Sequence, residues 1–228
     1  MSLRTGLSDA LILFDLDGTL VDTTELILES FAYAFECHLP AQLPAREQLI
    51  ATFGRSLPDT LCELAQEAGA FEPDSVGAAM LETYREFQLA HHDRLIRPIA
   101  GIEEALAALA AAGQRMGLVT SKMESFARRG LRQFGLEQYF ELGVFHEDTD
   151  RHKPDPAPLL LAAERAAVPP GRTVYVGDSV HDVAAGRAAG MRTVAVLWGP
   201  FDRLVLESAG PDVLVGAPQD LRRLLSAR

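Results

Sequence analysis

Residues 11–20 read Leu-Ile-Leu-Phe-Asp-Leu-Asp-Gly-Thr-Leu, four apolar residues followed by two acids, Asp15 and Asp17. A continuous apolar run of this length is typical of a strand buried on both faces of a parallel sheet. Ligands bind at the carboxyl ends of such strands, and alternate residues of an extended chain share a side, so we expect both carboxylates in one crevice. Gly18 permits a sharp turn there. Taken alone, two Asp before a Gly also fit an ordinary turn.

Similar apolar runs predict four more strands along the chain. Helical patterns separate most of them, and several of these patterns end at a glycine. The alternation implies right-handed crossovers and a doubly wound, Rossmann-like α/β fold with a parallel sheet. The predicted strands cover residues 11–14, 116–120, 142–145, 173–176 and 193–197, and the predicted helices cover residues 102–112, 125–134, 158–167 and 180–189.

The connection between the first two predicted strands interrupts this alternation. It contains amphipathic helical patterns at residues 24–35, 57–68 and 75–90, but no convincing strand. A structureless loop of that length would be unusual in a compact protein, so we expect an inserted, all-helical cap domain. We place the cap at residues 22–92 and the core at residues 1–21 and 93–228.

Composition limits the possible functions. The 228 residues are 48% apolar, enough for a sizeable core, and the net charge of −11 disfavours binding to nucleic acid. The sequence has neither a signal-peptide pattern nor an apolar segment long enough to cross a membrane. Two distant cysteines fit a reduced protein. We therefore expect a cytoplasmic monomer or homodimer that binds neither nucleic acid nor membranes.

Three further polar motifs follow predicted strands. Thr120 and Ser121 offer hydroxyl and N–H groups to an oxyanion, although such residues also cap helices. Lys153 stands in His-Lys-Pro-Asp-Pro, where the prolines fix the backbone, although most lysines are solvated. Asp178 and Asp182 lie one helical turn apart, so they can either bind Mg²⁺ together or cap a helix.

These four motifs, in this order, resemble those of the haloacid dehalogenase superfamily of phosphatases, and the resemblance covers nearly the whole chain. The inserted helices correspond to the cap of that family. The acid at position 17 favours phosphoryl chemistry, because dehalogenating relatives lack it. The motifs that carry the resemblance are Asp15 with Asp17, Thr120, Lys153, and Asp178 with Asp182.

The resemblance implies a phosphoric monoester hydrolase that requires Mg²⁺. Asp15 would form an aspartyl-phosphate, and Asp17 would act as general acid and base. Asp15, Asp17 through its backbone carbonyl, and Asp178 would bind Mg²⁺, with Asp182 in the outer shell. The residues expected to bind the phosphate are Gly18, Thr19, Thr120, Ser121 and Lys153.

The substrate is expected to be a small phosphorylated molecule. Residues 53–58 of the cap, Phe-Gly-Arg-Ser-Leu-Pro, are expected to face the site, where Arg55 could bind a carboxylate or a second phosphate. The alternative is a helix-helix turn with an exposed arginine. Residues 92–98 and 118–122 are similar to the phosphoglycolate phosphatase and bacterial pyrophosphatase branch. Phosphoglycolate is therefore the leading expectation, with pyrophosphate or a nucleotide as alternatives. Lys122 could contribute charge at the rim of the site, but we expect it to be a solvated lysine at the start of a helix.

Two other functions compete with this hypothesis. A sugar phosphomutase would use the same aspartyl-phosphate, with a cap that excludes water. A non-catalytic binding module would retain the fold without the chemistry. The presence of all four motifs favours the phosphatase.

Overall fold

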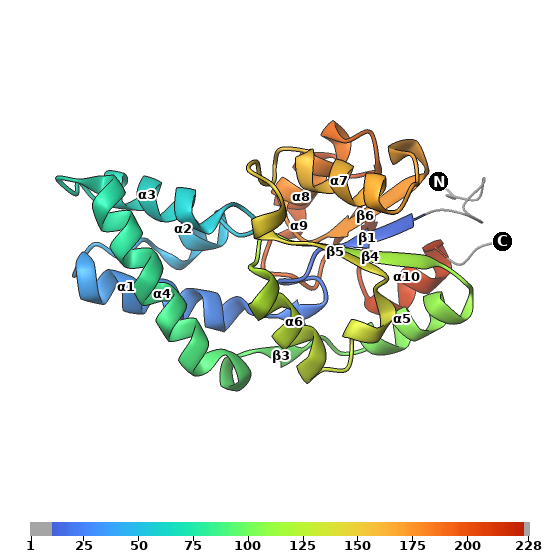
Figure 1. The fold of residues 1–228 in the computed structure, drawn as a ribbon, viewed down its shortest axis with the longest axis horizontal. Coiled ribbons are helices and arrows are strands. Elements are labelled where there is room, and N and C mark those ends of the chain that lie inside the picture. Colours follow the sequence, from blue (N-terminus) through green and yellow to red (C-terminus); the bar gives the residue numbers. More distant parts are fainter. Residues whose placement is uncertain (1–10, 226–228) are drawn as a thin grey trace.

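A six-stranded parallel sheet forms the centre of the protein in the computed structural model, which describes residues 11–225 (Figure 1). The strand order is β5-β4-β1-β6-β7-β8, and each neighbouring pair is parallel. The chain leaves the neighbours β1 and β6 in opposite directions, and ligands bind at the carboxyl ends of strands at such a switch point. The strands are β1 (Leu11–Phe14), β4 (Arg115–Val119), β5 (Leu142–Val144), β6 (Thr173–Gly177), β7 (Arg192–Val196) and β8 (Val213–Val215).

Helices cover both faces of the sheet (Figure 1). Side chains alternate along a strand, so β1 packs Ile12 and Phe14 on one face and Leu11 and Leu13 on the other. The doubly wound α/β fold expected from the sequence is thus confirmed. The first face packs against α5 (Ile102–Ala111), α6 (Glu124–Gln133) and α10 (Pro218–Leu225), and the second against α7 (Ala157–Arg165) and α8 (Val180–Ala188), with α9 (Arg203–Ala209) beside α8.

Four helices between β1 and β4 pack together at one side of the sheet, on the left of Figure 1. These cap helices share an apolar cluster that includes Phe31, Phe35, Leu61 and Met80. The two connections to the sheet lie side by side as the antiparallel strands β2 (Val21–Asp22) and β3 (Arg97–Pro98). The cap helices are α1 (Thr24–His38), α2 (Arg46–Ile50), α3 (Leu57–Glu67) and α4 (Pro73–Leu95).

The division into a core and a cap of residues 22–92 stays a proposal, and helix α4 continues to Leu95. Residues 1–10 and 226–228, which the sequence assigns to the core, lie outside the described part. Within residues 11–225, no helix is both long and apolar enough to cross a membrane. The elements that the sequence patterns did not predict are β2, β3, β8, α2, α9, α10 and the short 3₁₀ helices Glu137–Tyr139, His146–Asp148 and Pro170–Arg172.

Candidate active site

Asp15 occupies the first position after β1, where the backbone fixes it. Its N–H donates to the Val176 carbonyl of β6 over 2.9 Å, so the hydrogen bonds between β1 and β6 continue one residue beyond the end of β1. The chain then turns at Gly18, whose φ of +76° is left-handed and whose missing side chain leaves room for Asp178. Thr19 Oγ1 donates to Asp178 Oδ1 over 3.3 Å. The turn therefore brings Asp15 and Asp178 together at the carboxyl-terminal edge of the sheet, where the parallel strands end.

The Lys153 ammonium is buried at this edge among oxygen atoms. Its Nζ donates to Asp15 Oδ1 over 2.8 Å, to Asp182 Oδ1 over 2.7 Å and to the Tyr175 hydroxyl over 3.1 Å. That hydroxyl has one proton, which it can donate either to the Val119 carbonyl at 3.1 Å or to Asp182 Oδ1 at 3.0 Å. Burial lowers the pKa of Lys153, but Asp15 and Asp182 outweigh burial and raise it well above its ordinary value. Lys153 is therefore a fixed, charged partner of Asp15 rather than a solvated lysine.

Asp182 has both carboxylate oxygens hydrogen-bonded within the protein. Oδ2 accepts from the Ser179 N–H over 3.0 Å and from the Ser179 hydroxyl over 2.6 Å, as part of the N-terminal capping box of α8. Oδ1 accepts from Lys153 and lies 3.0 Å from the Tyr175 hydroxyl, which can donate to it. Burial raises the pKa of Asp182, but Lys153 and Ser179 outweigh it and lower that pKa below its ordinary value. Asp182 therefore caps a helix and also orients Lys153.

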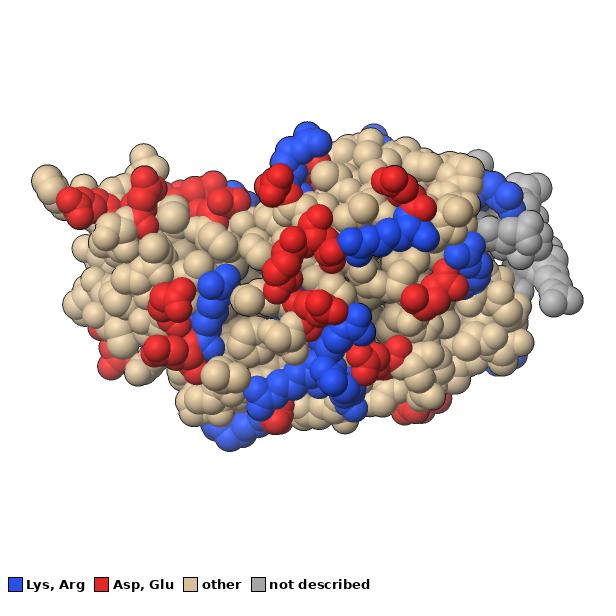
Figure 2. All heavy atoms as spheres, viewed as in Figure 1, with Lys and Arg blue, Asp and Glu red and all other residues tan. Residues whose placement is uncertain are grey.

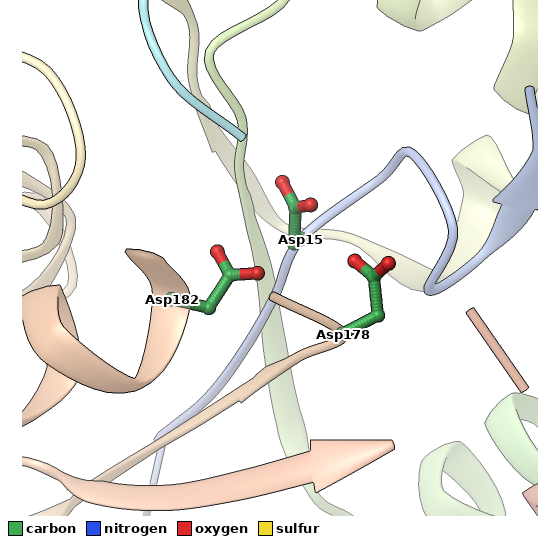
Figure 3. Close-up of side chains that lie close together, drawn as sticks. All are labelled: Asp15, Asp178 and Asp182. Carbon is green, nitrogen blue, oxygen red and sulfur yellow. The ribbon is translucent and has the colours of Figure 1, made fainter. Parts of the chain in front are cut away.

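Three buried carboxylates meet here with one ammonium. One oxygen each of Asp15, Asp178 and Asp182 lies within 4.8 Å of the others, and Figure 3 shows the three side chains projecting toward the same space. Burial raises the pKa of Asp15 to about 7 despite the opposing charge of Lys153, and Asp182 adds to the rise. Burial, with Asp182 and Asp15, raises the pKa of Asp178 well above its ordinary value. When Asp15, Asp178 and Asp182 are all ionised, their three negative charges therefore exceed the one positive charge of Lys153.

A divalent cation fits this excess of negative charge. Mg²⁺ takes hard oxygen ligands, commonly one or two carboxylates together with water and substrate phosphate. Asp15 and Asp178 suit it, because their raised pKa values show that the protein alone does not compensate their charges. Asp182 already accepts three hydrogen bonds from Lys153 and Ser179, and can accept a fourth from Tyr175, so it is better suited to support Lys153. Across residues 11–225, this trio is the one group of three or more potential metal ligands at suitable spacing.

Asp17 pairs with a second lysine. Lys122 Nζ donates to Asp17 Oδ1 over 2.8 Å, and the two side chains are 8% and 24% exposed, respectively. The Lys122 N–H donates to Thr120 Oγ1 over 3.2 Å, so the loop after β4 turns inward. The expectation of a solvated Lys122 is therefore wrong, because the ion pair with Asp17 offsets the loss of hydration.

A cavity of about 100 Å³ lies between this edge and the cap helices. At its rim, Ser121 Oγ donates to the Gly54 carbonyl over 2.8 Å and so joins core and cap. Arg55 lines the cavity as well, but its guanidinium binds both carboxylate oxygens of Glu63, over 2.8 and 2.7 Å. The core residues that line the cavity include Asp15, Asp17, Thr120, Ser121, Lys122, Lys153 and Asp178, and those from the cap helices and their connections include Phe31, Phe53, Arg55, Tyr84, Arg85 and Gln88.

The sequence analysis assigned no role to Tyr175, Lys122, Tyr84 or Gln88. A tyrosine in an otherwise apolar strand was one available signal, because a buried phenol needs a hydrogen-bond partner. Composition was another, since Lys122 and Lys153 are the only two lysines in the sequence and the other 19 of its 21 Lys and Arg residues are arginine. Both lysines bind an acid of the Asp15–Asp17 motif.

The fold and this site together define a parallel α/β protein with three buried carboxylates and one buried lysine at the carboxyl ends of its strands. The family model for haloacid dehalogenase-like hydrolases matches residues 12–196. A protein named PpaX from Caldanaerobacter subterraneus is 39% identical over 214 residues, which cover 94% of this chain and 92% of that protein. Pyrophosphatase PpaX from Halalkalibacterium halodurans is 33% identical over 217 residues, covering 95% and 97% of the two chains.

Solved structures agree with the fold. A hydrolase from Pseudomonas syringae has a TM-score of 0.84 at 26% identity and covers 95% of this chain and 98% of its own. A predicted phosphoglycolate phosphatase from Haemophilus somnus has a TM-score of 0.80 at 24% identity, with 95% and 97% coverage, and is similar in fold. The chain belongs to the haloacid dehalogenase-like hydrolase family, and it is a phosphatase.

Proposed function

We propose that this phosphatase is Mg²⁺-dependent and hydrolyses a small phosphorylated substrate through an aspartyl-phosphate on Asp15. The position of Asp15 carries the proposal, because its carboxylate contacts Lys153, adjoins Asp178 and lines the cavity. A buried carboxylate beside a fixed ammonium has the surroundings expected of a nucleophile that attacks an anion. The Mg²⁺ ligands would be Asp15, Asp178 and the Asp17 backbone carbonyl.

The reaction has two balanced steps. First, an Asp15 oxygen bonds to phosphorus while the bond from phosphorus to the leaving oxygen breaks, and Asp17 gives that oxygen a proton. Second, Asp17 takes a proton from water, whose oxygen bonds to phosphorus while the bond from phosphorus to Asp15 breaks. Orthophosphate leaves, and both acids are restored. When bound, Mg²⁺ would neutralise charge on the phosphoryl group.

Donors at the sheet edge would hold the remaining phosphoryl oxygens. Lys153 holds its positive charge beside the attacking Asp15 carboxylate, and Thr120, which carries a hydroxyl, lines the cavity. Such preorganised donors stabilise charge in the transition state without reorganising during the reaction. The Ser121 N–H completes the proposed set. Gly18 and Thr19 were also expected to bind the phosphate, but their N–H groups donate to the Val21 and Leu16 carbonyls and the Thr19 hydroxyl donates to Asp178, so they stabilise the turn instead.

We favour pyrophosphate as the substrate. Relatives named pyrophosphatase, among them one from Bacillus cereus that is 35% identical over 215 residues, align with 94% of this chain or more. A cavity of about 100 Å³ also suits a small molecule. Phosphoglycolate, the leading expectation from the sequence, is the second candidate, because its carboxylate replaces the second phosphate as an anionic group.

A phosphate-release assay tests the proposed reaction. With Mg²⁺, the protein is expected to release orthophosphate from pyrophosphate, from phosphoglycolate or from both, and also from acetyl phosphate. Chelation of the metal is expected to reduce the rates by about 100-fold or more, because charge on the phosphoryl group is no longer neutralised. Steady release without a sugar bisphosphate distinguishes a hydrolase from a mutase. If Mg²⁺ supports hydrolysis of none of these compounds, the proposal is wrong.

Mg²⁺ is also expected to stabilise the protein against heat, and more strongly at pH 8 than at pH 5.5. The pKa of Asp15 is raised from 3.8 to about 7 in the folded state, so ionisation costs folding stability as the pH rises through that range. Mg²⁺ binds the ionised carboxylate and removes this cost. We expect the Tm to rise by about 3–6 °C at pH 8, and by less than half as much at pH 5.5.

An Asp178→Asn variant is the control for this measurement. It retains the shape of the side chain but removes a carboxylate ligand, so the Mg²⁺-dependent rise in Tm should be largely lost. An equal rise in the variant would argue against Mg²⁺ at Asp178.

A further inference from the structure

Lys122 is a cation for which the Asp15 chemistry gives no role. The chain uses arginine for 19 of its 21 cationic Lys and Arg residues, yet lysine is present at positions 122 and 153. An ammonium is a compact charge with three donors, whereas a guanidinium is a wide planar fork. Lys153 uses three partners at once, namely Asp15, Tyr175 and Asp182. Lys122 binds Asp17 and lines the cavity, which leaves it donors for a ligand there.

Two polar residues of cap helix α4 face the same cavity. Tyr84 and Gln88 are 3% and 5% exposed, and both line it. Gln88 Nε2 donates to the Tyr84 hydroxyl over 3.1 Å. Phe31 packs edge-on against the Tyr84 ring, with the two ring centroids 5.1 Å apart. Because the Tyr84 oxygen accepts from Gln88, its own proton is available to another acceptor. Tyr84 and Asp17 line the same cavity, and burial, followed by the charge of Asp17, raises the pKa of Tyr84, so the phenol stays protonated.

The cap wall of the cavity suits an anion. Arg55 and Arg85 of the cap line the cavity, and each is paired with a glutamate outside the lining: Arg55 binds Glu63, and Arg85 lies 3.7 Å from Glu82. None of the described cap residues in the lining is an acid. The acids in the lining, Asp15, Asp17 and Asp178, all come from the sheet edge. This distribution contrasts with the net charge of −11 and with the acidic side chains visible over the cap helices in Figure 2. A ligand between the two walls would therefore have Asp15 and the proposed Mg²⁺ ligands on one side, and on the other a wall with neutral donors and no acidic side chain.

We propose that Lys122, Tyr84 and Gln88 form a leaving-group subsite, which binds an anionic leaving group such as the second phosphate of a diphosphate beside Asp17. This inference rests on the proposed function and identifies the part of the site that selects the substrate. Lys122 then contacts both Asp17 and the leaving group, and Tyr84 donates to the leaving group from the cap. Gln88 fixes the direction of the Tyr84 hydroxyl. An arginine at position 122 would be too wide to serve both partners.

The test compares substrates that differ in the charge of the leaving group. Pyrophosphate has an anionic leaving group, whereas the acetyl group of acetyl phosphate carries no charge before cleavage. Tyr84→Phe keeps the ring against Phe31 and removes only the hydroxyl. We expect it to lower kcat/KM for pyrophosphate about 10-fold or more, the effect of one hydrogen bond to a charged group, and for acetyl phosphate no more than about 3-fold.

Two further variants and one inhibitor extend the comparison. In Lys122→Met, kcat/KM for pyrophosphate divided by kcat/KM for acetyl phosphate is expected to fall by at least about 10-fold. Lys122→Arg should show a similar fall, because a guanidinium does not replace the ammonium here. Inhibition by methylenediphosphonate should weaken about 10-fold in Tyr84→Phe, while inhibition by orthophosphate stays the same. Tyr33→Phe, on an exposed cap tyrosine, is the matched control and should behave as the wild type.

The outcomes separate this inference from the proposed function. If wild-type protein hydrolyses acetyl phosphate but Tyr84→Phe and Lys122→Met reduce both substrates equally, the phosphatase proposal stands and the subsite is wrong. If the wild type hydrolyses acetyl phosphate but neither pyrophosphate nor phosphoglycolate, the subsite is also wrong. If the wild type hydrolyses none of the three with Mg²⁺, the proposed function itself fails.

Discussion

Asp15→Asn is expected to abolish turnover while preserving the fold. The amide has the shape of the carboxylate but cannot attack phosphorus, so kcat should fall by about 10⁴-fold or more with every substrate. Asp15 is buried in a cluster with too little positive charge, and the substitution removes one negative charge from it. The Tm without Mg²⁺ should therefore equal or exceed that of the wild type. Steady-state kinetics and thermal unfolding measure the two effects.

The aspartyl-phosphate itself can be detected by rapid quenching. Wild-type protein that turns over labelled acetyl phosphate should carry the label on a peptide containing Asp15, and Asp15→Asn should carry none. Asp150→Asn, at an exposed loop position, is the matched control and should be labelled as the wild type. Label on the Asp15→Asn protein, or turnover within 10-fold of the wild type, would assign the nucleophile to another group.

The sheet was predictable from the sequence where its strands are fully buried. The apolar runs at residues 11–14 and 173–176 correspond to β1 and β6, which have neighbours on both sides and helices on both faces. β8 was missed: Val213–Val215 has three residues, pairs only with β7 and is half-buried over most of its length. Such an edge strand needs no long apolar run, so its sequence resembles a loop. β5 is an edge strand of the same length and burial, but its apolar run continues into the buried Phe145 and was therefore predicted.

The meeting of Asp15 and Asp178 was predictable for a different reason. Parallel strands of one sheet end at the same side, so acids that follow β1 and β6 meet there whatever their separation in sequence. The structure adds that these strands are neighbours and that Gly18 makes room for Asp178. The pairing of Lys122 with Asp17 joins residues 105 positions apart, and no local pattern encodes it. Tyr84 and Gln88 lie on an amphipathic helix, where an aromatic residue has the same pattern whether it faces a core or a cavity.

Lys153→Met is expected to damage both stability and catalysis. The ammonium is bound to Asp15 and Asp182, whose side chains are 4% and 2% exposed. Removing one partner of a buried ion pair leaves an uncompensated charge and costs about 3–5 kcal/mol, which is a fall in Tm of about 6–20 °C for a chain of this size. The loss of a cation that stabilises the phosphoryl oxygens should also lower kcat by about 10³-fold.

The pH dependence identifies the cause of this loss. Without Lys153, the pKa values of Asp15 and Asp182 should rise, so the folded state binds protons more tightly than the unfolded chain. The destabilisation should then be larger at pH 8 than at pH 5, and Mg²⁺ should reverse part of it at pH 8. Arg151→Met is the control, because that side chain is 73% exposed and its ion pair with Asp155 is worth about 1 kcal/mol at most. If Lys153→Met unfolds at the wild-type temperature at pH 8, the acids of this edge do not depend on its ammonium for their charge balance.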